Sequence, residues 1–564
     1  MEVYFQLCEA KGTSHHFMET SSLFPSESCF ESASLETLDR MLGRACRTFA
    51  QHDAFHCLGQ TFSYEMIEGW ALHFASWLQD QGLTVGTRVA VMLPNLPQYP
   101  VVVYGILRAG GVVVNCNPLY TPRELEFQLR DAEAEYLVVL ENFAHTVAQA
   151  RVPSLRHVIV TQVGDLMGLR GTVINLVLRY WKKAIPAWHM DAVFSFPTVL
   201  EQGKNRPFTC PSLTPEHLAF LQYTGGTTGR AKGAMLSHHN IMANLGQVGI
   251  WHGQHLVPGQ EKVVTALPLY HIFALTANCL LFWKLGATNL LIPNPRDIPG
   301  LVRALKPYPM SIFTGVNTLF DALLSNPAFA HLDFSHLKST LGGGMAVKHE
   351  VAHHWQIVTG CCINQAYGLT ETSPGVCLNP FDVQTFDGSV GQPLPYTEIS
   401  LRNDEGNEVP PAASGEVCIR GPQVMSGYWQ QPEETSQAFW PDGYFRSGDI
   451  GHWNPTGTLT LLDRKKDMIK VSGFNVYPNE IEEILSHHPG IAEVAAIGVE
   501  DVHSGEAITV FVVRRDPNLT EQALLAWCHQ ELTGYKIPRH IEFRTELPHS
   551  TVGKVLRRAL KATA

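Results

Sequence analysis

The stretch YTGGTTGRAKG, residues 223–233, constrains the fold of this chain more than any other part of the sequence. It holds four glycines and three threonines, and apolar runs lie on both sides of it, at 218–221 and 234–236. This pattern predicts a strand, a glycine-rich loop and a second strand. Glycine lets backbone N–H groups approach a ligand closely, and successive N–H groups form a nest that binds anions. With the threonine hydroxyls and the charge of Lys232, the loop predicts a polyphosphate site.

A Gly/Thr-rich surface loop without a ligand is the alternative interpretation of these residues. A kinase-type or ATPase-type P-loop is disfavoured, because Arg230 and Ala231 separate Gly229 from Lys232. The Walker A pattern instead has a Gly-Lys pair followed directly by serine or threonine. The loop therefore predicts phosphate binding of another kind.

The composition is that of a globular protein with several domains. A chain of 564 residues is too long to fold around a single compact core, so about two to four domains are expected. Apolar residues make up 45% and charged residues 16% of the chain. The net charge of −11 argues against a nucleic-acid-binding protein, whose surface would be basic.

The twelve cysteines include no CxxC pair, and residues 1–24 show no secretory signal. Reduced thiols and a cytoplasmic location are therefore expected. No run of about twenty apolar residues occurs, so no membrane-spanning helix is expected.

Short apolar runs alternate with segments of helical spacing through most of the chain. The first 34 residues are polar and serine-rich, and we expect a poorly ordered leader there. Residues 35–80 have helical spacing throughout. Buried strands are expected at Arg88–Leu93, Val112–Asn115, Glu135–Leu140 and His157–Thr161. This alternation predicts an α/β fold of stacked layers with parallel sheets.

The end of the chain has a different pattern, which is typical of a separate α+β domain. Strand-like runs at Glu493–Gly498 and Ala507–Val513 alternate with helical ones at Pro478–His487 and Glu521–Thr533. The expected division is a variable leader at 1–34, a large domain at 35–464 and a small mobile domain at 465–564.

Residues 171–188, GTVINLVLRYWKKAIPAW, combine helical apolar spacing with basic and aromatic side chains. Arg179, Lys182 and Lys183 cluster beside Tyr180 and Trp181. A basic amphipathic helix with aromatic residues can lie in a membrane interface. A surface helix packed on the protein core is an equal alternative.

Several further segments carry residue types found in binding and catalytic sites. They are ALPLYHIF with His271, LGGGMA with Gly343, NQAYGLTET with Tyr367 and Glu371, GYFRSGD with Asp449, DRKKDMIKVSG with Arg464, and PHSTVGKVLRR with Lys554. An aromatic ring such as Tyr367 can stack on a base, and one carboxylate with phosphate oxygens suffices for Mg²⁺. Singly these signals are weak, because a lone histidine is usually packed in a core and a terminal lysine is usually solvated.

Taken in order, these motifs resemble the motif set of adenylate-forming enzymes, the superfamily of acyl-CoA synthetases, luciferases and peptide-synthetase adenylation domains. The matching motifs are YTGGTTGRAKG, LPLYHIF, GGGMAV, YGLTE, YFRSGD, DRKKDMIKVSGFNVYPNEIEE and STVGK. Seven motifs in one order are far more specific than any one of them, and the resemblance covers residues 35–558. The chain looks most like bacterial long-chain fatty acyl-CoA synthetases, through LPLYHIFALTANCLL, NPRDIPGLVRALK and TGVNTLFDALL, with VSGFNVYPNEIEE.

The resemblance implies a large, multi-layered N-terminal α/β domain and a small, mobile α+β domain. It implies that a long-chain fatty acid attacks the α-phosphate of ATP, bound with Mg²⁺, to give an acyl-adenylate and pyrophosphate. Coenzyme A then displaces AMP to form the thioester. Negative charge gathers at the α-phosphorus in the transition state, so cations and preorganised donors stabilise it. The resemblance leaves two questions open. One is whether the protein forms a homodimer, and the other is whether it contacts an anionic membrane peripherally, at the cytoplasmic face of the inner membrane.

The resemblance also implies roles for individual residues. ATP would contact Tyr223, Thr224, Gly225, Gly226, Thr227, Thr228, Gly229, Lys232 and Gly233. Residues 224–232 would hold its β- and γ-phosphates, and Thr224 and Glu371 would hold Mg²⁺. The nucleoside and α-phosphate would contact Gly343, Gln365, Ala366, Tyr367, Thr370, Asp449 and Arg464. The catalytic residues would be Lys554, which reaches the α-phosphate, His271, which flanks the acyl carboxylate, and Lys466, a hinge whose rotation brings Gly473 to coenzyme A.

The chain departs from the family pattern at two positions. Tyr444 stands where the family often has tryptophan, and Arg230 stands where many relatives have an uncharged residue. Neither change removes a residue that is expected to bind the substrates. A fatty acyl-AMP ligase is the first alternative, but such enzymes typically carry an insertion near the domain junction, and SGDIGHWNPTGTLTLLDRKKD has none. A catalytically silent lipid-binding protein is disfavoured because the charged motif residues are all present. A ligase for short- or medium-chain carboxylic acids remains an alternative.

Overall fold

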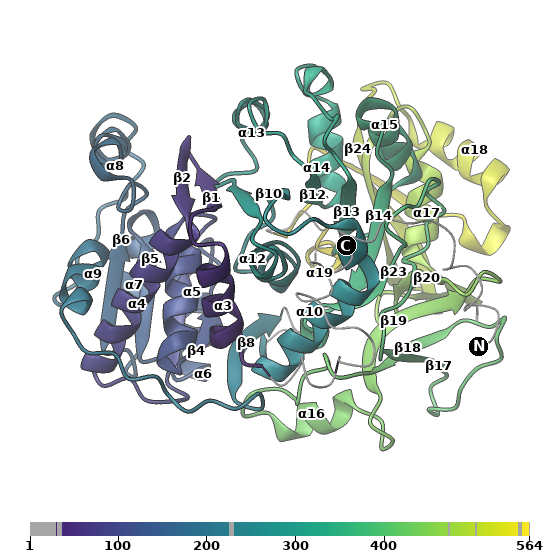
Figure 1. Ribbon diagram of the computed structural model, residues 1–564. Coiled ribbons are helices and arrows are strands. Elements are labelled where there is room, and N and C mark those ends of the chain that lie inside the picture. The colour runs from purple at the N-terminus through teal and green to yellow at the C-terminus, as the bar shows by residue number, and fades with distance from the viewer. Residues whose placement is uncertain are drawn as a thin grey trace, which may run out of the picture.

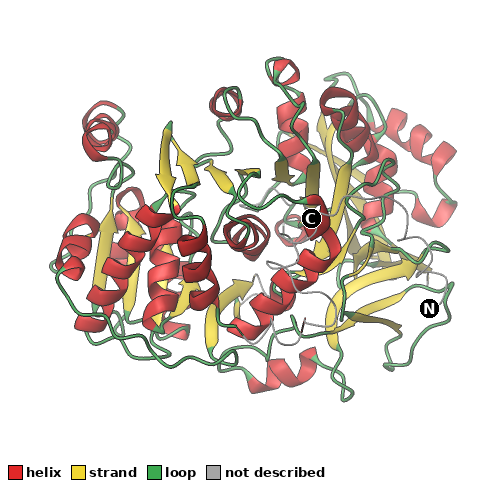
Figure 2. Cartoon of the chain, in the orientation of Figure 1, coloured by secondary structure: helices red, strands yellow, loops and turns green. Residues whose placement is uncertain are grey.

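The structure is a computed structural model that describes residues 30, 36–224, 231–471, 474–501, 505–550 and 555–562. A large N-terminal α/β domain carries a smaller C-terminal domain, which is yellow in Figure 1. Helices flank two large sheets in the first domain, as Figure 2 shows by colour. The predicted fold class is therefore confirmed.

The first large sheet has seven strands in the order β7-β6-β5-β3-β4-β8-β9. Their bounds are Phe194–Ser195 (β7), His157–Thr161 (β6), Tyr136–Leu140 (β5), Arg88–Met92 (β3), Val112–Asn115 (β4), Leu218–Thr224 (β8) and Lys232–Ser237 (β9). All neighbours are parallel except β8 and β9, which pair antiparallel. The strands expected at 88–93, 112–115, 135–140 and 157–161 are confirmed.

Helices cover both faces of this sheet, which explains why its strands are continuous apolar runs. Val89 and Val91 of β3 pack in a core shared with α4 (Tyr64–Asp80) and α5 (Gln98–Ala109). Ala90 and Met92 face the other core, which includes α6 and α7. The bounds of these last two helices are Pro122–Asp131 (α6) and Ala144–Gln149 (α7). A capping box between Thr121 and Glu124 starts α6, with Pro122 at its first turn.

The second large sheet has nine strands in the order β16-β15-β14-β13-β12-β10-β11-β1-β2. Their bounds are Gln392–Pro393 (β16), Gly375–Leu378 (β15), Ile363–Gly368 (β14), Ser339–Gly343 (β13), Ile312–Gly315 (β12), Lys262–Thr265 (β10), Thr288–Leu291 (β11), Asp53–Cys57 (β1) and Gln60–Ser63 (β2). The central strands from β14 to β1 are parallel.

The hairpin β1–β2 corrects the helical expectation for residues 35–80. Only α3 (Leu38–Thr48) and α4 in this range are helical. Strand β1 pairs with β11, more than two hundred residues further along the chain, and buries Phe55. Long-range pairing of this kind overrides local spacing, which is why the sequence pattern was misleading here.

The helices over the nine-stranded sheet are α10 (His238–His252), α11 (Ile272–Ala274), η5 (Leu275–Leu280), α12 (Leu281–Lys284), α13 (Ile298–Leu305), α14 (Asn317–Leu324) and α15 (His349–Thr359). Helix α12 also contacts α3, so one core joins the two sheets. Trp283 is fully buried there, with its ring edge-on to those of Phe55, Tyr64 and Tyr104. Such aromatic contacts stabilise the layer between the sheets.

A four-stranded antiparallel sheet completes the large domain. It consists of β17 (Glu398–Arg402), β18 (Gly415–Arg420), β19 (Phe445–Trp453) and β20 (Leu459–Arg464), and α16 (Pro432–Ala438) packs beside it. The sheet ends at Arg464, and the next sheet begins at Ile469. The predicted boundary between residues 464 and 465 lies at the start of this short connection.

The C-terminal domain has a five-stranded sheet with its own apolar core. Its elements are β21 (Ile469–Val471), β22 (Phe474–Val476), α17 (Pro478–Ser486), β23 (Ile491–Asp501), β24 (Gly505–Arg514), α18 (Glu521–Glu531), β25 (His540–Arg544) and α19 (Arg557–Lys561). The strands and helices expected between residues 478 and 533 are confirmed.

The segment predicted to be helical at 171–188 is helical over a shifted range. Helix α8 (Gly168–Leu176) continues as a π-helical turn, η3 (Val177–Trp181), and then ends. Pro186 lacks a backbone N–H and disfavours helix at the residue before it, so the helix cannot continue to 188. The next helix is α9 (Phe196–Lys204). No helix in the described ranges is long and apolar enough to cross a membrane.

Of the predicted leader, only Phe30 belongs to the described residues. Its ring is buried and stacks on that of Tyr396, with centroids 4.3 Å apart. This end of the chain therefore touches the surface near β17.

Candidate active site

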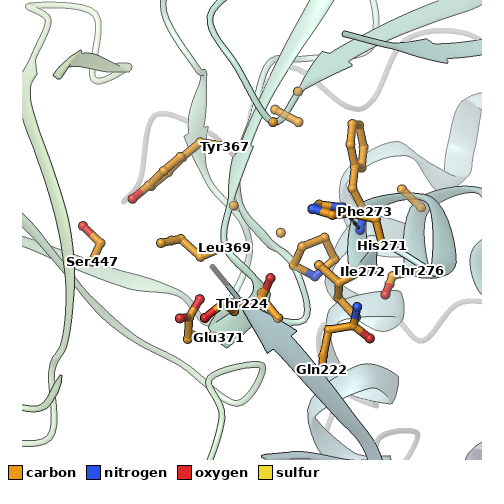
Figure 3. Close-up of a pocket in the computed structure, with 18 of the residues that line it drawn as sticks. Gln222, Thr224, His271, Ile272, Phe273, Thr276, Tyr367, Leu369, Glu371 and Ser447 are labelled. Carbon is orange, nitrogen blue, oxygen red and sulfur yellow. Dashed lines mark hydrogen bonds between the residues drawn. The ribbon is translucent and has the colours of Figure 1, made fainter. Parts of the chain in front are cut away.

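A cavity of about 1210 Å³ lies between the two domains. Ligand pockets usually measure about 300–1,000 Å³, so this one has room for more than one small ligand. Its polar part is lined by the ends of β8, β9, β13, β14 and β19, and its apolar part by α10, η5 and α12. Figure 3 shows residues from both parts.

The strands β8 and β9 flank the glycine-rich loop, as the sequence predicted. Tyr223 pairs with Gly233 and Thr224 with Lys232 in the antiparallel ladder. A Cβ at Gly233 would lie 3.1 Å from the Tyr223 ring, so glycine permits this close pairing. Gly225, Gly226, Thr227, Thr228 and Gly229 lie outside the described residues. Tyr223, Thr224 and Lys232 line the cavity.

Lys232 is held by two side chains that the sequence motifs did not identify. Its ammonium group forms an ion pair with Glu434 of α16 and lies 5.1 Å from the centre of the Tyr428 ring. Both neighbours line the cavity. Only a fold that brings residues 232, 428 and 434 together could reveal this arrangement. The ion pair and the aromatic ring hold the Lys232 side chain beside the end of β8.

Glu371 lies in the short helical turn η7 (Thr370–Thr372), which contacts β8. Its Oε1 accepts a hydrogen bond of 2.9 Å from the Tyr428 hydroxyl, and burial raises the pKa of its carboxyl. Figure 3 shows its carboxylate beside the side chain of Thr224. A carboxylate oxygen has two lone pairs, so Glu371 retains acceptor capacity toward the cavity. Thr370 also lines the cavity.

A second polar cluster joins β14 to the β19–β20 ladder. The Tyr367 hydroxyl donates to Asp449 Oδ2 at 2.7 Å, and Arg464 Nε lies 2.7 Å from Asp449 Oδ1. Asp449 and Arg464 are partners across β19 and β20. Burial raises the pKa of Tyr367, so its hydroxyl remains a donor. Arg464 also donates to the carbonyl of Ser447 at 3.2 Å, and both residues line the cavity.

Gly343 and Ala366 line the cavity, whereas the side chain of Gln365 is directed into the protein. Gln365 donates to the carbonyl of Ser389 at 3.0 Å and accepts from the backbone N–H of Val347 at 3.2 Å. Any contact of Gln365 with a nucleotide would therefore need its backbone. Successive side chains of a strand point to opposite faces of the sheet, and the motif alone does not show on which face Gln365 lies.

His271 lies at the junction of the polar and apolar parts of the cavity, with Ile272 and Phe273 beside it (Figure 3). Its Nδ1 accepts a hydrogen bond of 3.3 Å from the backbone N–H of Phe273 and caps α11. Loss of solvation lowers the pKa of His271 to about 4. The imidazole is therefore neutral near pH 7.

Beyond His271 the cavity wall becomes apolar. It is lined there by Leu245, Val248, Leu256, Ala277, Leu281, Phe282, Ile312 and Leu341. Thr276 faces the same space, and its buried Oγ1 has no hydrogen-bond partner among the described residues. The sequence did not identify this wall, because its residues come from α10, η5, α12, β12 and β13 and from Leu256 between η4 (Gly253–His255) and β10.

The C-terminal domain closes one side of the cavity. Lys466 and Asp467, between the two domains, line it, as do Ser550 and Val555 on either side of residues 551–554. Lys554 and Gly473 themselves lie outside the described residues. The predicted residues that are brought together at the cavity are therefore Tyr223, Thr224, Lys232, His271, Gly343, Ala366, Tyr367, Thr370, Glu371, Arg464 and Lys466.

Known proteins resemble this chain over nearly its whole length. It is 52% identical over 532 residues to the long-chain-fatty-acid–CoA ligase of Escherichia coli O6:H1, covering 94% of this chain and 95% of the relative. It is 50% identical to the long-chain-fatty-acid–CoA ligase of Yersinia pestis, covering 93% and 94% of the two chains. The crystal structure of ATP-bound MatB from Rhodopseudomonas palustris superposes with a TM-score of 0.77 at 28% identity, covering 94% and 99%.

Two family descriptions match the two domains. Residues 42–429 match the AMP-binding enzyme family, and residues 480–554 match the AMP-binding enzyme C-terminal domain. The first match spans more than half of the chain, and it includes β8, β9, β14 and η7, which line the polar part of the cavity. The chain belongs to the AMP-binding enzyme family.

Proposed function

We propose that this protein is a long-chain fatty acid–CoA ligase, which converts a fatty acid, ATP and coenzyme A into acyl-CoA, AMP and pyrophosphate. The observation that carries the proposal is one cavity with a polar end at Thr224, Lys232 and Glu371 and an apolar part beyond His271. The identity of about half of all residues to long-chain-fatty-acid–CoA ligases supports the same substrates.

The reaction explains why both ends of the cavity are needed. A carboxylate is a poor acyl donor, because the group that leaves would be oxide. In the first step a carboxylate oxygen bonds to the α-phosphorus of ATP, and the bond to pyrophosphate breaks. In the second step the sulfur of coenzyme A bonds to the acyl carbon, and AMP leaves. The apolar wall would hold the chain while these exchanges occur at the polar end.

At the polar end, the backbone of residues 224–229 and Lys232 would bind the β- and γ-phosphates. Thr224 and Glu371 would hold Mg²⁺, since one carboxylate, one hydroxyl and phosphate oxygens form a suitable donor set. A magnesium ion there would offset charge on the phosphates. Lys554 would add positive charge at the α-phosphate from the segment between Ser550 and Val555. Pairing with Glu434 keeps Lys232 oriented toward this region.

The nucleoside would bind next to the Tyr367–Asp449–Arg464 cluster. Asp449 would accept hydrogen bonds from the ribose hydroxyls, because each of its oxygens can accept a second bond. Gly343 and Ala366 would leave space for adenine, with Tyr367 beside it and Thr370 near the α-phosphate. His271, neutral at pH 7, would flank the acyl carboxylate without attracting it as a cation.

Transfer to coenzyme A would require rotation of the small domain about Lys466, which lies between β20 and β21. This rotation would withdraw Lys554 from the cavity and bring Gly473 to the thiol. The boundary between the rotating parts would fall between residues 464 and 465.

Peripheral contact with an anionic membrane is part of this proposal, and the outer face of α8 and η3 is its site. Six of the fourteen exposed large apolar side chains among the described residues lie between 169 and 181. Leu169 is 89% and Trp181 86% exposed. Arg179 is paired with Glu141, which leaves Lys182 and Lys183 for lipid headgroups.

Sedimentation with vesicles tests the membrane site. The Lys182→Glu, Lys183→Glu double variant should bind vesicles of phosphatidylglycerol and phosphatidylcholine at least tenfold more weakly than the native protein. A variant with the same charge change elsewhere, Lys204→Glu with Lys306→Glu, should bind like the native protein. Equal binding by all three proteins would refute this site.

The activity itself is tested by pyrophosphate release with palmitate and ATP, with and without coenzyme A. Palmitoyl-CoA should form only when coenzyme A is present. Pyrophosphate release without any thioester would favour a fatty acyl-AMP ligase instead. If palmitate is inert and butyrate reacts, the chain is a short-chain ligase. The short turn between Trp453 of β19 and Leu459 of β20 leaves no insertion near the domain junction and favours the CoA ligase.

A further inference from the structure

Arg557 forms a network of charged contacts where the two domains meet. It lies three residues after Lys554 in the sequence and begins α19. Both of its terminal nitrogens and its Nε are engaged by carboxylate or amide oxygens. The partners are Glu482 and Asn479 of α17, Asp463 of β20, and Asp467 of the connection between the domains.

Some of these contacts stay inside the C-terminal domain. Arg557 Nη2 lies 2.8 Å from both carboxylate oxygens of Glu482 and 2.6 Å from Asn479 Oδ1. Glu482 also accepts a hydrogen bond of 2.8 Å from the backbone N–H of Ala496 in β23. These bonds attach the terminal segment to the body of the small domain, so they would survive any rotation of that domain.

Other contacts cross from one domain to the other, and all of them meet at the end of β20. Arg557 Nη1 donates to Asp463 Oδ1 at 3.2 Å, and the backbone N–H of Asn479 donates to Asp463 Oδ2 at 2.8 Å. The side-chain amide of Asn479 donates to the carbonyl of Leu462 at 3.1 Å. Asp463 belongs to the large domain because β20 pairs with β19.

Because Asp463 is buried, this junction favours one orientation of the two domains. Its side chain is only 1% exposed, and burial raises the pKa of its carboxyl. A buried carboxylate is stable only when it is paired and hydrogen-bonded. Arg557 and Asn479 supply that pairing in the present orientation of the domains, in which Ser550 and Val555 line the cavity.

We propose that Asp463 is a positioning residue that latches the small domain, through Arg557 and Asn479, in the orientation used for adenylation. The latch holds Val555 and the start of α19 at the cavity, and it opens when the domain rotates toward the thioester-forming orientation. This inference rests on the proposed two-step function. It assigns Asp463 no contact with substrate, since Asp463 acts only through the domain orientation.

The two half-reactions separate this role from a merely structural one. In Asp463→Asn the amide oxygen can still accept from Asn479, but the charge that attracts Arg557 is gone. Formation of palmitoyl-AMP from palmitate and ATP should fall at least tenfold in kcat, with KM for ATP within twofold of the native value. Transfer from added palmitoyl-AMP to coenzyme A should keep its native rate or rise. Glu483→Gln, an exposed neighbour on α17, should change neither half-reaction.

A second measurement does not depend on activity. Trypsin cleaves after Lys465 and Lys466 in the connection between the domains, and a released latch should expose this connection. Asp463→Asn should therefore be cut there at least fivefold faster than the native protein, whereas Glu483→Gln should not. Arg557→Lys should give values between those of the native protein and Arg557→Gln in both assays. Lysine keeps the positive charge but lacks the planar guanidinium, which can bind a carboxylate with two hydrogen bonds.

The outcomes distinguish the latch from the function on which it rests. If the native protein makes no palmitoyl-AMP, the proposed function fails, and the trypsin assay still decides whether Asp463 joins the domains. If Asp463→Asn slows both half-reactions equally, or leaves adenylation and cleavage at native rates, the latch is refuted. A matched thermal unfolding profile for Asp463→Asn and the native protein excludes misfolding as the cause.

Discussion

Filling the apolar part of the cavity should shorten the fatty acids that the enzyme accepts. Ala277 lines the cavity in η5, opposite α10, and Ala277→Phe would place six ring carbons in the space proposed for the chain. At interior packing density a ring displaces about four methylene groups. Each buried methylene contributes about 0.8 kcal/mol, so about 3 kcal/mol of binding is lost. That loss corresponds to about a 200-fold decrease in kcat/KM for palmitate.

The assay is acyl-CoA formation with saturated acids of eight to sixteen carbons. Octanoate should keep kcat/KM within about threefold of the native value, because it has half as many carbons and fewer of its methylene groups depend on the filled space. Leu281→Met conserves volume at the same wall and should leave the whole profile unchanged. An unchanged kcat/KM for palmitate in Ala277→Phe would refute the assignment of this wall to the acyl chain. An equal decrease for all chain lengths would indicate general damage.

Three further predictions follow from buried polar groups. Thr276→Val removes a buried hydroxyl that has no partner among the described residues and should lower KM for palmitate two- to fivefold, as measured by steady-state kinetics. Glu371→Gln removes the carboxylate from the proposed Mg²⁺ site and should raise the Mg²⁺ concentration for half-maximal activity at least tenfold, as measured by metal titration. Burial lowers the pKa of His238 and of His252 to about 4, so the unfolded chain binds protons below pH 6.5 that the folded chain does not. Stability should fall between pH 6.5 and 4 by up to about 3 kcal/mol for each histidine, and His238→Asn should flatten that decline in Tm.

The polar end of the site was predictable because its residues lie in contiguous motifs. Residues 223–233 carry a strand–loop–strand pattern, and the structure has β8 and β9 on either side of the loop. Three separate motifs predict that Tyr367 contacts adenine and that Asp449 and Arg464 bind ribose, and these side chains are bonded to one another in the structure. The structure brings these three residues together, and their role in binding a nucleoside stays a prediction.

The parts that were missed depend on contacts between distant residues. Tyr428 and Glu434 hold Glu371 and Lys232, but nothing in their own sequence neighbourhood indicates a phosphate site. Local spacing predicts helix where the β1–β2 hairpin lies, because the partner strand of β1 is far along the chain. The side chain of Gln365 is directed into the protein, since a strand alternates its faces. Helical and strand spacing report local geometry and carry no information on such partners.

Isotope transfer tests the central claim most directly. Palmitate labelled with ¹⁸O in its carboxylate is incubated with ATP, Mg²⁺ and coenzyme A, and the products are separated for mass spectrometry. If a carboxylate oxygen bonds to the α-phosphorus and AMP leaves with it, each AMP should carry one ¹⁸O and pyrophosphate none. Lys554→Ala should produce labelled AMP at least a hundredfold more slowly. Unlabelled AMP, or label in pyrophosphate or phosphate, would contradict an acyl-adenylate in this cavity.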